Sequence, residues 1–237
     1  MIRPDRSGLT RKEIIRLAAN RFLNEGYSKT SIHSMCKALR MSTGNLTFHF
    51  PTKEHLLTEL VDMLCNFQWH RMEEEAEEGN SSLLALCLEL MSIAAACEQD
   101  EVAKDFFLST YRSQMSMELI RSNDKKRAKE VFKEYCPDWT EEQFVMAELL
   151  IMGIEYSTIT SNQGILPLKT RIEGALNQIL SIYNIDEETR KIEIEKVLQM
   201  DCRSIGKRVL SEFVKYVEET NNHTLEEASR IHRRKMV

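Results

Sequence analysis

The chain has 237 residues, of which 42% are apolar and 29% charged, proportions ordinary for a soluble globular protein. It contains only 8 Gly and 4 Pro, too few for a fold rich in β-turns. Helix-forming Ala, Leu, Glu, Lys, Arg and Met recur instead, so we expect an all-α fold. The sequence has no run of about 18 apolar residues and no apolar core near its polar N-terminus, which argues against a membrane span or a signal peptide.

The net charge of −5 is unevenly distributed. Residues 1–60 contain ten Lys/Arg and five Asp/Glu, whereas the remaining residues contain 22 basic and 32 acidic side chains. A basic end and an acidic remainder are typical of a protein that meets a polyanion at one end. The alternative is a chance excess of charge on a solvated surface.

Six cysteines are scattered along the chain without a C-x-x-C motif or a cluster of histidines. This spacing argues against a disulfide framework and against a zinc site, so we expect free, mostly buried thiols and no metal or other cofactor. A reducing, cytoplasmic location fits best.

The first predicted helix begins with a capping box, in which the Thr10 hydroxyl and the Glu13 carboxylate each serve a backbone N–H. Gly26 is expected to end it, because the residue after a helix often needs a positive φ. Arg3 and Arg6 precede this helix on an expected flexible arm that could reach a minor groove.

Two short helical segments follow, separated by a tight break, and together they predict a helix-turn-helix. Thr30 or Ser31 can cap the first segment. Ser42 or Thr43 can cap the second, which ends near Phe50. Nothing else in the sequence suggests a specific chemistry.

A fourth helix is expected to start with Thr52 as its cap and to continue without a breaker to Gly79, linking the basic and acidic parts. Further helices are expected in the acidic part, among them one with a capping box at Thr140 and Gln143. One or two helices follow the segment at 168–185, and Thr224 is expected to cap a final short helix.

The segment 43–49 has the features of a helix that reads the major groove: it is short, and its start is polar. Leu46 and Phe50 would anchor it, and Asn45 could pair with adenine. The predicted DNA-binding residues are Thr30, Ser31, Arg40, Ser42, Thr43, Gly44, Asn45, Thr47, Phe48, His49 and Lys53. Thr30, Ser31 and Lys53 are expected to bind phosphate, and Gly44 to let the backbone approach it. Each polar residue taken singly would be read as a cap, a loop residue or a solvated side chain.

The stretch from residue 10 to 57, with Gly26-Tyr27, Ser42-x-Gly44-x-Leu46 and His49-Phe50-Pro51 in order, resembles the N-terminal domain of TetR-family transcriptional regulators. Two positions depart from the pattern. Thr47 stands where the family usually has a Tyr that reaches a phosphate, so either Phe48 or His49 takes part of that role or the DNA is approached differently. Arg40 replaces a small residue at the turn and could contact phosphate.

The resemblance implies a DNA-binding domain at 1–55 and a helical ligand-binding and dimerisation domain at 56–237. It also implies a homodimer on a palindromic operator, and we expect helices at about 141–162 and 168–183 to form the interface. The alternative for these apolar helices is an internal core.

A ligand pocket is expected among the middle helices. Its candidate lining residues are Trp69, Met91, Phe106, Phe107, Tyr111 and Met115, which could instead be plain core. The favoured function is a dimeric repressor released from its operator by a small apolar or amphipathic ligand. A regulator controlled by a protein partner, through the acidic surface or the basic segment at 230–235, is the alternative. An enzyme would need a catalytic constellation, and the sequence contains no recognisable one.

Overall fold

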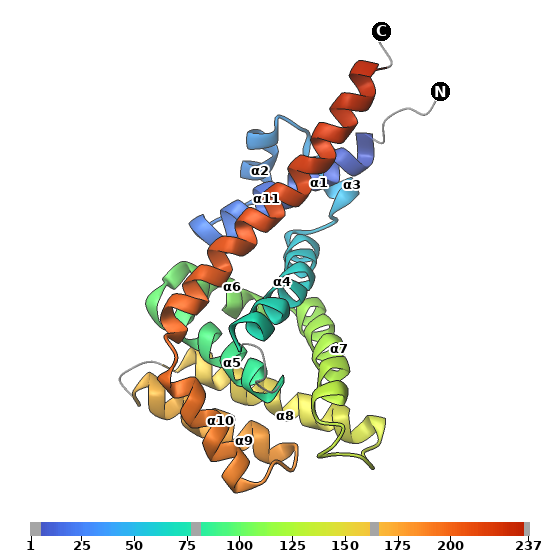
Figure 1. The fold of residues 1–237 in the computed structure, drawn as a ribbon. Coiled ribbons are helices and arrows are strands. Elements are labelled where there is room, and N and C mark those ends of the chain that lie inside the picture. Colours follow the sequence, from blue (N-terminus) through green and yellow to red (C-terminus); the bar gives the residue numbers. More distant parts are fainter. Residues whose placement is uncertain (1–5, 77–81, 162–165, 235–237) are drawn as a thin grey trace.

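The computed structural model describes residues 6–76, 82–161 and 166–234, and the side chains within them except those of 6–9 and 221–234. Within these ranges the regular secondary structure is entirely helical (Figure 1). This confirms the all-α fold predicted from the sequence.

Three helices form the N-terminal part, which we call the head. They are α1 (Arg6–Arg21), which continues into a π-helical turn at Phe22–Gly26, α2 (Ile32–Leu39) and α3 (Thr43–His49). The prediction that Thr10 caps the first helix was wrong, because α1 already begins at Arg6. No proline interrupts the chain between these two residues, so the helix extends through the capping sequence.

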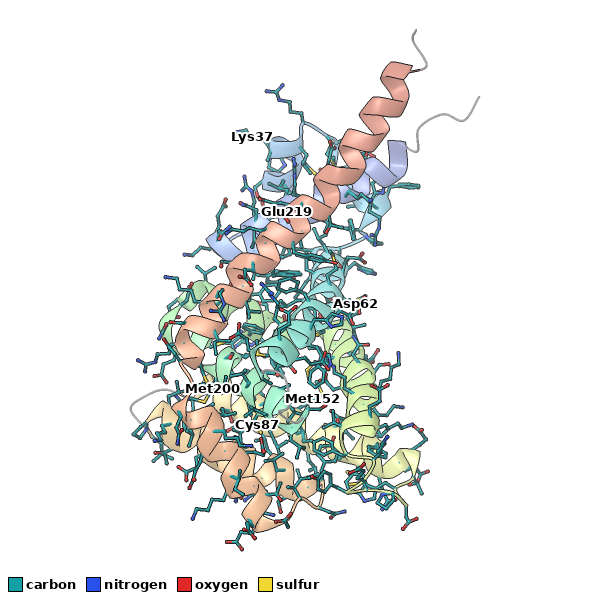
Figure 2. The ribbon with its side chains drawn as sticks, in the orientation of Figure 1. Lys37, Asp62, Cys87, Met152, Met200 and Glu219 are labelled. Atoms are coloured by element: carbon teal, nitrogen blue, oxygen red, sulfur yellow. The ribbon has the colours of Figure 1, made fainter. Side chains whose placement is uncertain are left out.

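Four helices lead from the head into the rest of the molecule, which we call the body. They are α4 (Lys53–Glu75), α5 (Ser82–Gln99), α6 (Glu101–Arg112) and α7 (Gln114–Val131). Side chains of α4, α5 and α7 project into the space between their ribbons (Figure 2). The long helix predicted after Thr52 is thus confirmed, and it runs from the head into the body (Figure 1). The predicted domain division after residue 55 falls in the first turn of α4 and stays a prediction.

The chain ends with α8 (Glu141–Thr160), α9 (Leu168–Ile182), α10 (Glu187–Gln199) and α11 (Cys202–Arg234). The prediction of a separate short helix capped by Thr224 was wrong, since α11 is continuous through that position. A threonine inside a helix can satisfy its hydroxyl without ending the helix, so a cap signal alone does not decide a boundary.

α11 returns from the body to the head and runs alongside α1 (Figure 1). Near its start Gly206 lies so close to α5 that a Cβ there would come within 2.4 Å of the Ser92 carbonyl oxygen. Further along, Glu212 forms an ion pair with Arg71 of α4, and Phe213 and Val217 are buried in the same hydrophobic cluster as the head.

Two hydrophobic clusters stabilise the fold. One lies in the body and includes a stacked pair, Phe132 and Tyr183, with ring centroids 3.8 Å apart. The other contains the core of the head and continues through α4 to Phe106 and Phe107 of α6 and to Phe213 of α11. The head therefore shares its apolar core with the body.

Among the described residues, one helix, Ser82–Gln99, is long and apolar enough to cross a membrane by length and composition. The helix contains Glu89 and Glu98, so the expectation that the sequence has no uninterrupted run of about 18 apolar residues stands. Most of this helix is buried inside the body, as expected of a core helix.

Candidate nucleic-acid interface and internal cavity

The two helices of the predicted helix-turn-helix are capped by their own sequences. Ser31, one of the two predicted candidates, caps α2: its hydroxyl accepts from the Ser34 N–H, and the Ser34 hydroxyl accepts from the Ser31 N–H. Ser42 caps α3 by accepting from the Asn45 N–H at 3.2 Å. These bonds satisfy N–H groups that have no partner within the helix, so each helix starts at a defined residue.

The side chains of α3 divide into an anchored and an exposed set. Leu46 is fully buried and Phe50, just after the helix, is 3% exposed, as predicted for anchors. Arg11 of α1 lies over the Phe50 ring and forms an ion pair with Glu59 of α4. The end of α3 is therefore fixed to both α1 and α4.

The exposed set contains five of the predicted DNA-binding residues. Ser42, Thr43, Gly44 and Asn45 are exposed. Phe48 is 77% exposed and packs edge-on against His49, an unusual exposure for a large apolar ring.

Thr47 points only partly outward. It is half-buried, and its hydroxyl donates to the Thr43 carbonyl at 3.0 Å. The exposed Phe48 ring, next along the helix, therefore projects further from α3 than the Thr47 hydroxyl does.

Thr30 and Lys53, both predicted to bind phosphate, lie together and face inward. Thr30 is 3% exposed, and its hydroxyl donates to the Gly26 carbonyl. The Lys53 ammonium donates to the carbonyls of Tyr27 at 3.0 Å and Thr30 at 2.9 Å, and it lies 3.9 Å from the centroid of the Tyr27 ring. Burial lowers the pKa of Lys53, and the nearby Asp105 opposes that shift. In this structure the two residues join the start of α4 to the turn before α2.

Arg40 ends α2 with a φ of 53°, in the left-handed region that residues other than glycine rarely adopt. Its N–H bonds to carbonyls of the last turn of α2, and its side chain is exposed. Gly26, with a φ of 104°, ends the preceding helical segment as predicted. Arg40 therefore sits strained at the turn between the two helices, with its guanidinium free to reach outward.

The head as a whole has the arrangement of a helix-turn-helix, with a short capped helix whose polar start faces solvent. Residues 14–60 match the family model described as bacterial regulatory proteins of the tetR family. The chain carries a TetR-family DNA-binding domain. The match runs from α1 through α2 and α3 to the start of α4, the same region in which the sequence resembles that family.

Two solved structures are similar to the chain over most of its length. One is the TetR-family protein CprB from S. coelicolor, with a TM-score of 0.44 and 19% identity over 82% of this chain and 98% of that chain. The other is Salmonella enterica GusR, with a TM-score of 0.41 and 21% identity over 81% of this chain and 96% of that one. None of the curated proteins matches this chain.

The body contains a cavity of about 100 Å³ between α4, α5, α6, α7, α8 and α9. Four of the six side chains predicted to line a pocket do line it, namely Trp69, Phe106, Phe107 and Tyr111. Met91 is buried in the core and Met115 lies exposed at the start of α7, so neither borders the cavity.

The sequence reasoning missed the charged residues of the cavity. These are Glu89 of α5, Asp124 and Arg127 of α7, and Glu148 and Glu155 of α8. A signal existed: Glu148 and Glu155 are seven residues apart in an apolar helix, a spacing that places both on one face. A carboxyl group on an otherwise apolar face is rarely buried without a partner.

Arg127 is bonded to two of the four carboxylates. It lies 3.0 Å from Glu89 and 3.2 Å from Asp124, and it also stacks over the Trp69 ring at 5.0 Å. Burial opposes the charged form of Arg127, but the two carboxylates raise its pKa and keep it protonated. Burial raises the pKa of Asp124 well above its usual range, although Arg127 acts in the other direction.

Glu148 and Glu155 each have a tyrosine as hydrogen-bond donor and, among the described residues, no cation within ion-pair distance. Tyr183 donates to Glu148, and Tyr111 donates to Glu155 at 2.9 Å. Burial raises the pKa of Glu155 to about 8, the bond from Tyr111 opposes this, and the nearby Glu148 and Glu89 carboxylates add to it. Burial likewise raises the pKa of Glu148, against the bond from Tyr183.

α6 lies between the cavity and the head. Phe106, Phe107 and Tyr111 face the cavity, while Asp105, on the same helix, accepts hydrogen bonds from the N–H and hydroxyl of Ser28 in the head. The start of α4 is tied to the body in the same region.

At the start of α4, Glu54 accepts a hydrogen bond from the hydroxyl of Ser113, the residue that caps α7. Thr58, one turn further along α4, shares a hydrogen bond with Ser116 of α7 at 3.0 Å. A displacement of α6 would therefore move the turn before α2, and a displacement of α7 would move the start of α4.

Proposed function

We propose that this protein is a homodimeric repressor that binds a palindromic operator and is released when a small molecule enters the body cavity. The observation that carries the ligand-responsive part is the position of α6, which borders the cavity with Phe107 and Tyr111 and holds the head through Asp105. A ligand that favours a different placement of α6 and α4 lowers DNA affinity by its preference for that state. The activity is regulatory rather than enzymatic, and its proposed place is the cytoplasm.

A row of exposed apolar side chains on α8 supports the homodimer. Val145, Met146, Leu149 and Leu150 are 36–57% exposed, and Tyr156 continues the row. Such a continuous apolar strip is typical of an interface, because a helix face that stayed in water would be polar. The proposed partner is a second copy of the chain packing through α8 and α9, with the two reading helices one helical turn of DNA apart.

The dimer is tested by replacing Leu149 with Arg and measuring mass by sedimentation. We expect Leu149→Arg to sediment as a folded monomer that binds the operator weakly. The control is Ile192→Arg on α10, another exposed apolar residue, 46% exposed, outside the proposed interface. If Leu149→Arg remained a dimer, this interface would be wrong.

Operator recognition is tested with the DNA upstream of the protein's own gene, searched for a palindrome and used in mobility-shift assays. Asn45→Ala is expected to weaken binding to the palindrome by about 1–3 kcal/mol and to leave binding to random DNA unchanged. Asn24, exposed at the end of the first helical segment, provides the matched Asn24→Ala control. Equal losses on both DNAs would place Asn45 on the backbone rather than on a base.

Regulation is tested with a compound that binds the cavity. It should reduce operator affinity in proportion to its occupancy of the protein. A compound that binds tightly in the cavity and leaves operator affinity unchanged would contradict the proposed release mechanism.

A further inference from the structure

The charges around the body cavity do not balance. Four carboxyl groups and one guanidinium border it, and the guanidinium of Arg127 is already bonded to Glu89 and Asp124. Glu148 and Glu155 are left with tyrosine hydroxyls alone. The cavity thus presents an excess of negative or potentially negative groups. Glu148 is buried and the other three are half-buried, where an uncompensated charge is costly.

A second polar group at the cavity is also without a partner. Gln68 of α4 is 4% exposed and borders the cavity, and its amide makes no hydrogen bond to any of the described residues. Buried amides are nearly always hydrogen-bonded, so an unpaired one beside an open space indicates a missing partner. This observation is independent of the carboxyl groups. Gln68 also borders a smaller cavity, and an occupant of the larger one would give its amide a partner.

The rest of the lining is aromatic and apolar, and this excludes a bare metal ion as the best match. Trp69, Phe107 and Tyr111 border the same space, and aromatic rings attract organic cations. The protein itself provides an example, since the Arg127 guanidinium stacks over Trp69. No cluster of ligating side chains suited to a metal occurs among the described residues.

We propose that the cavity binds a small organic cation with a flat apolar body, whose positive charge lies between Glu148 and Glu155. This inference rests on the proposed ligand-responsive function and names the chemical class of the ligand. The cavity volume of about 100 Å³ is smaller than the roughly 150 Å³ of an engineered cavity that holds benzene, so it limits the ligand to a compound built on a single ring. The positive charge of the ligand supplies the cationic partner that the two carboxyl groups lack among the described residues.

The test compares three compounds of similar shape and different charge. They are phenyltrimethylammonium, its uncharged carbon isostere tert-butylbenzene, and the anion benzenesulfonate, each titrated into the full-length protein in sealed calorimetry cells. We expect phenyltrimethylammonium to bind about tenfold more tightly than tert-butylbenzene, and benzenesulfonate not to bind. Equal or tighter binding of tert-butylbenzene or benzenesulfonate would overturn the proposal, as would no binding of phenyltrimethylammonium.

Variants assign the preference to the two carboxyl groups. The double variant Glu148→Gln/Glu155→Gln keeps side-chain shape and the ability to accept from both tyrosines, so it should remain folded, and thermal unfolding checks this. It is expected to lose the tenfold preference while still binding tert-butylbenzene. Glu130→Gln, an exposed position on α7, should keep the preference. A preference that survives in a folded double variant would refute the assignment.

Operator release separates this inference from the proposed function. If phenyltrimethylammonium binds with the expected preference but does not change operator affinity, the cation site stands and the release mechanism fails. If an uncharged or anionic compound binds the cavity and releases the operator instead, the proposed function stands and the cation site fails.

Discussion

Lys53 provides a direct test of the structural role found for a residue that the sequence assigned to DNA. Lys53→Met keeps most of the aliphatic stem and removes two charge-assisted hydrogen bonds, of 3.0 and 2.9 Å, and the contact with the Tyr27 ring. Buried bonds of this kind contribute about 1.5–3 kcal/mol each, but Lys53 is half-exposed and its desolvation is itself unfavourable. We therefore expect a net loss of about 2 kcal/mol in the free energy of unfolding.

Two assays separate the two roles of Lys53. For a chain of this length, the expected loss in the free energy of unfolding corresponds to a decrease of roughly 4–8 °C in Tm. The salt dependence of operator binding should be unchanged, because the ammonium faces two carbonyl groups rather than DNA. Each lysine that neutralises a phosphate contributes about 0.9 to the slope of log K against log salt.

The matched control is Lys37→Met. Lys37 is an exposed lysine of α2 in the head, and its replacement should change the free energy of unfolding by less than about 0.5 kcal/mol. A Lys53→Met protein of unchanged stability, with a salt slope reduced by about 1 per protomer, would refute the structural role and restore the phosphate contact predicted from sequence.

Three further predictions concern stability. Arg40→Gly removes the left-handed strain at the turn and should raise the free energy of unfolding, measured in urea, by up to about 1 kcal/mol. The same substitution should weaken operator binding. An unchanged operator affinity would show that the Arg40 guanidinium does not contact DNA. Glu155→Gln should stabilise the protein increasingly as pH rises. Burial raises the folded-state pKa of Glu155 from 4.5 to about 8, so the contribution of Glu155 to the free energy of unfolding is fully present below about pH 4.5 and is lost as pH rises through about 8. The loss is on the order of 2–4 kcal/mol, and urea unfolding near pH 6 and near pH 9 measures it. A constant gap between variant and parent across that range would contradict the burial of the carboxyl group. Gly206→Ala should lower the free energy of unfolding by about 1–3 kcal/mol, because the new Cβ would clash with the Ser92 carbonyl. Gly44→Ala, whose Cβ would have no atom within 4 Å, should raise it by about 0.5–1 kcal/mol. Denaturation of both variants gives the comparison.

The sequence determined the local features of the head. Caps at Ser31, Ser42 and Thr52 depend on a side chain and a backbone N–H three residues away. The pattern alone therefore predicted Thr52, and it left one alternative each for the other two, Thr30 for Ser31 and Thr43 for Ser42. The buried Leu46 followed from helical periodicity in the same way. Because these interactions span less than two turns of helix, the local sequence contains all the information they need.

Cap signals failed where the neighbouring sequence permitted the helix to continue. Thr10 lies inside α1 and Thr224 inside α11, although each resembled a start. A hydroxyl can stabilise a helix start, but it does not prevent residues before it from being helical. The boundary is decided by all the residues on both sides and by what the helix packs against.

Tertiary structure alone decided where charged side chains point and what they meet. Lys53 faces Thr30 because α4 begins beside the turn before α2, a contact between residues 23 positions apart. Glu148 and Glu155 border a cavity because α5, α6 and α7 pack against α8 and bring Tyr111 and Arg127 to it. The sequence determined the fold class and the short capped helix α3, since short-range hydrogen bonds and periodicity encode both. The cavity and its charge arise from burial, which depends on how distant helices pack.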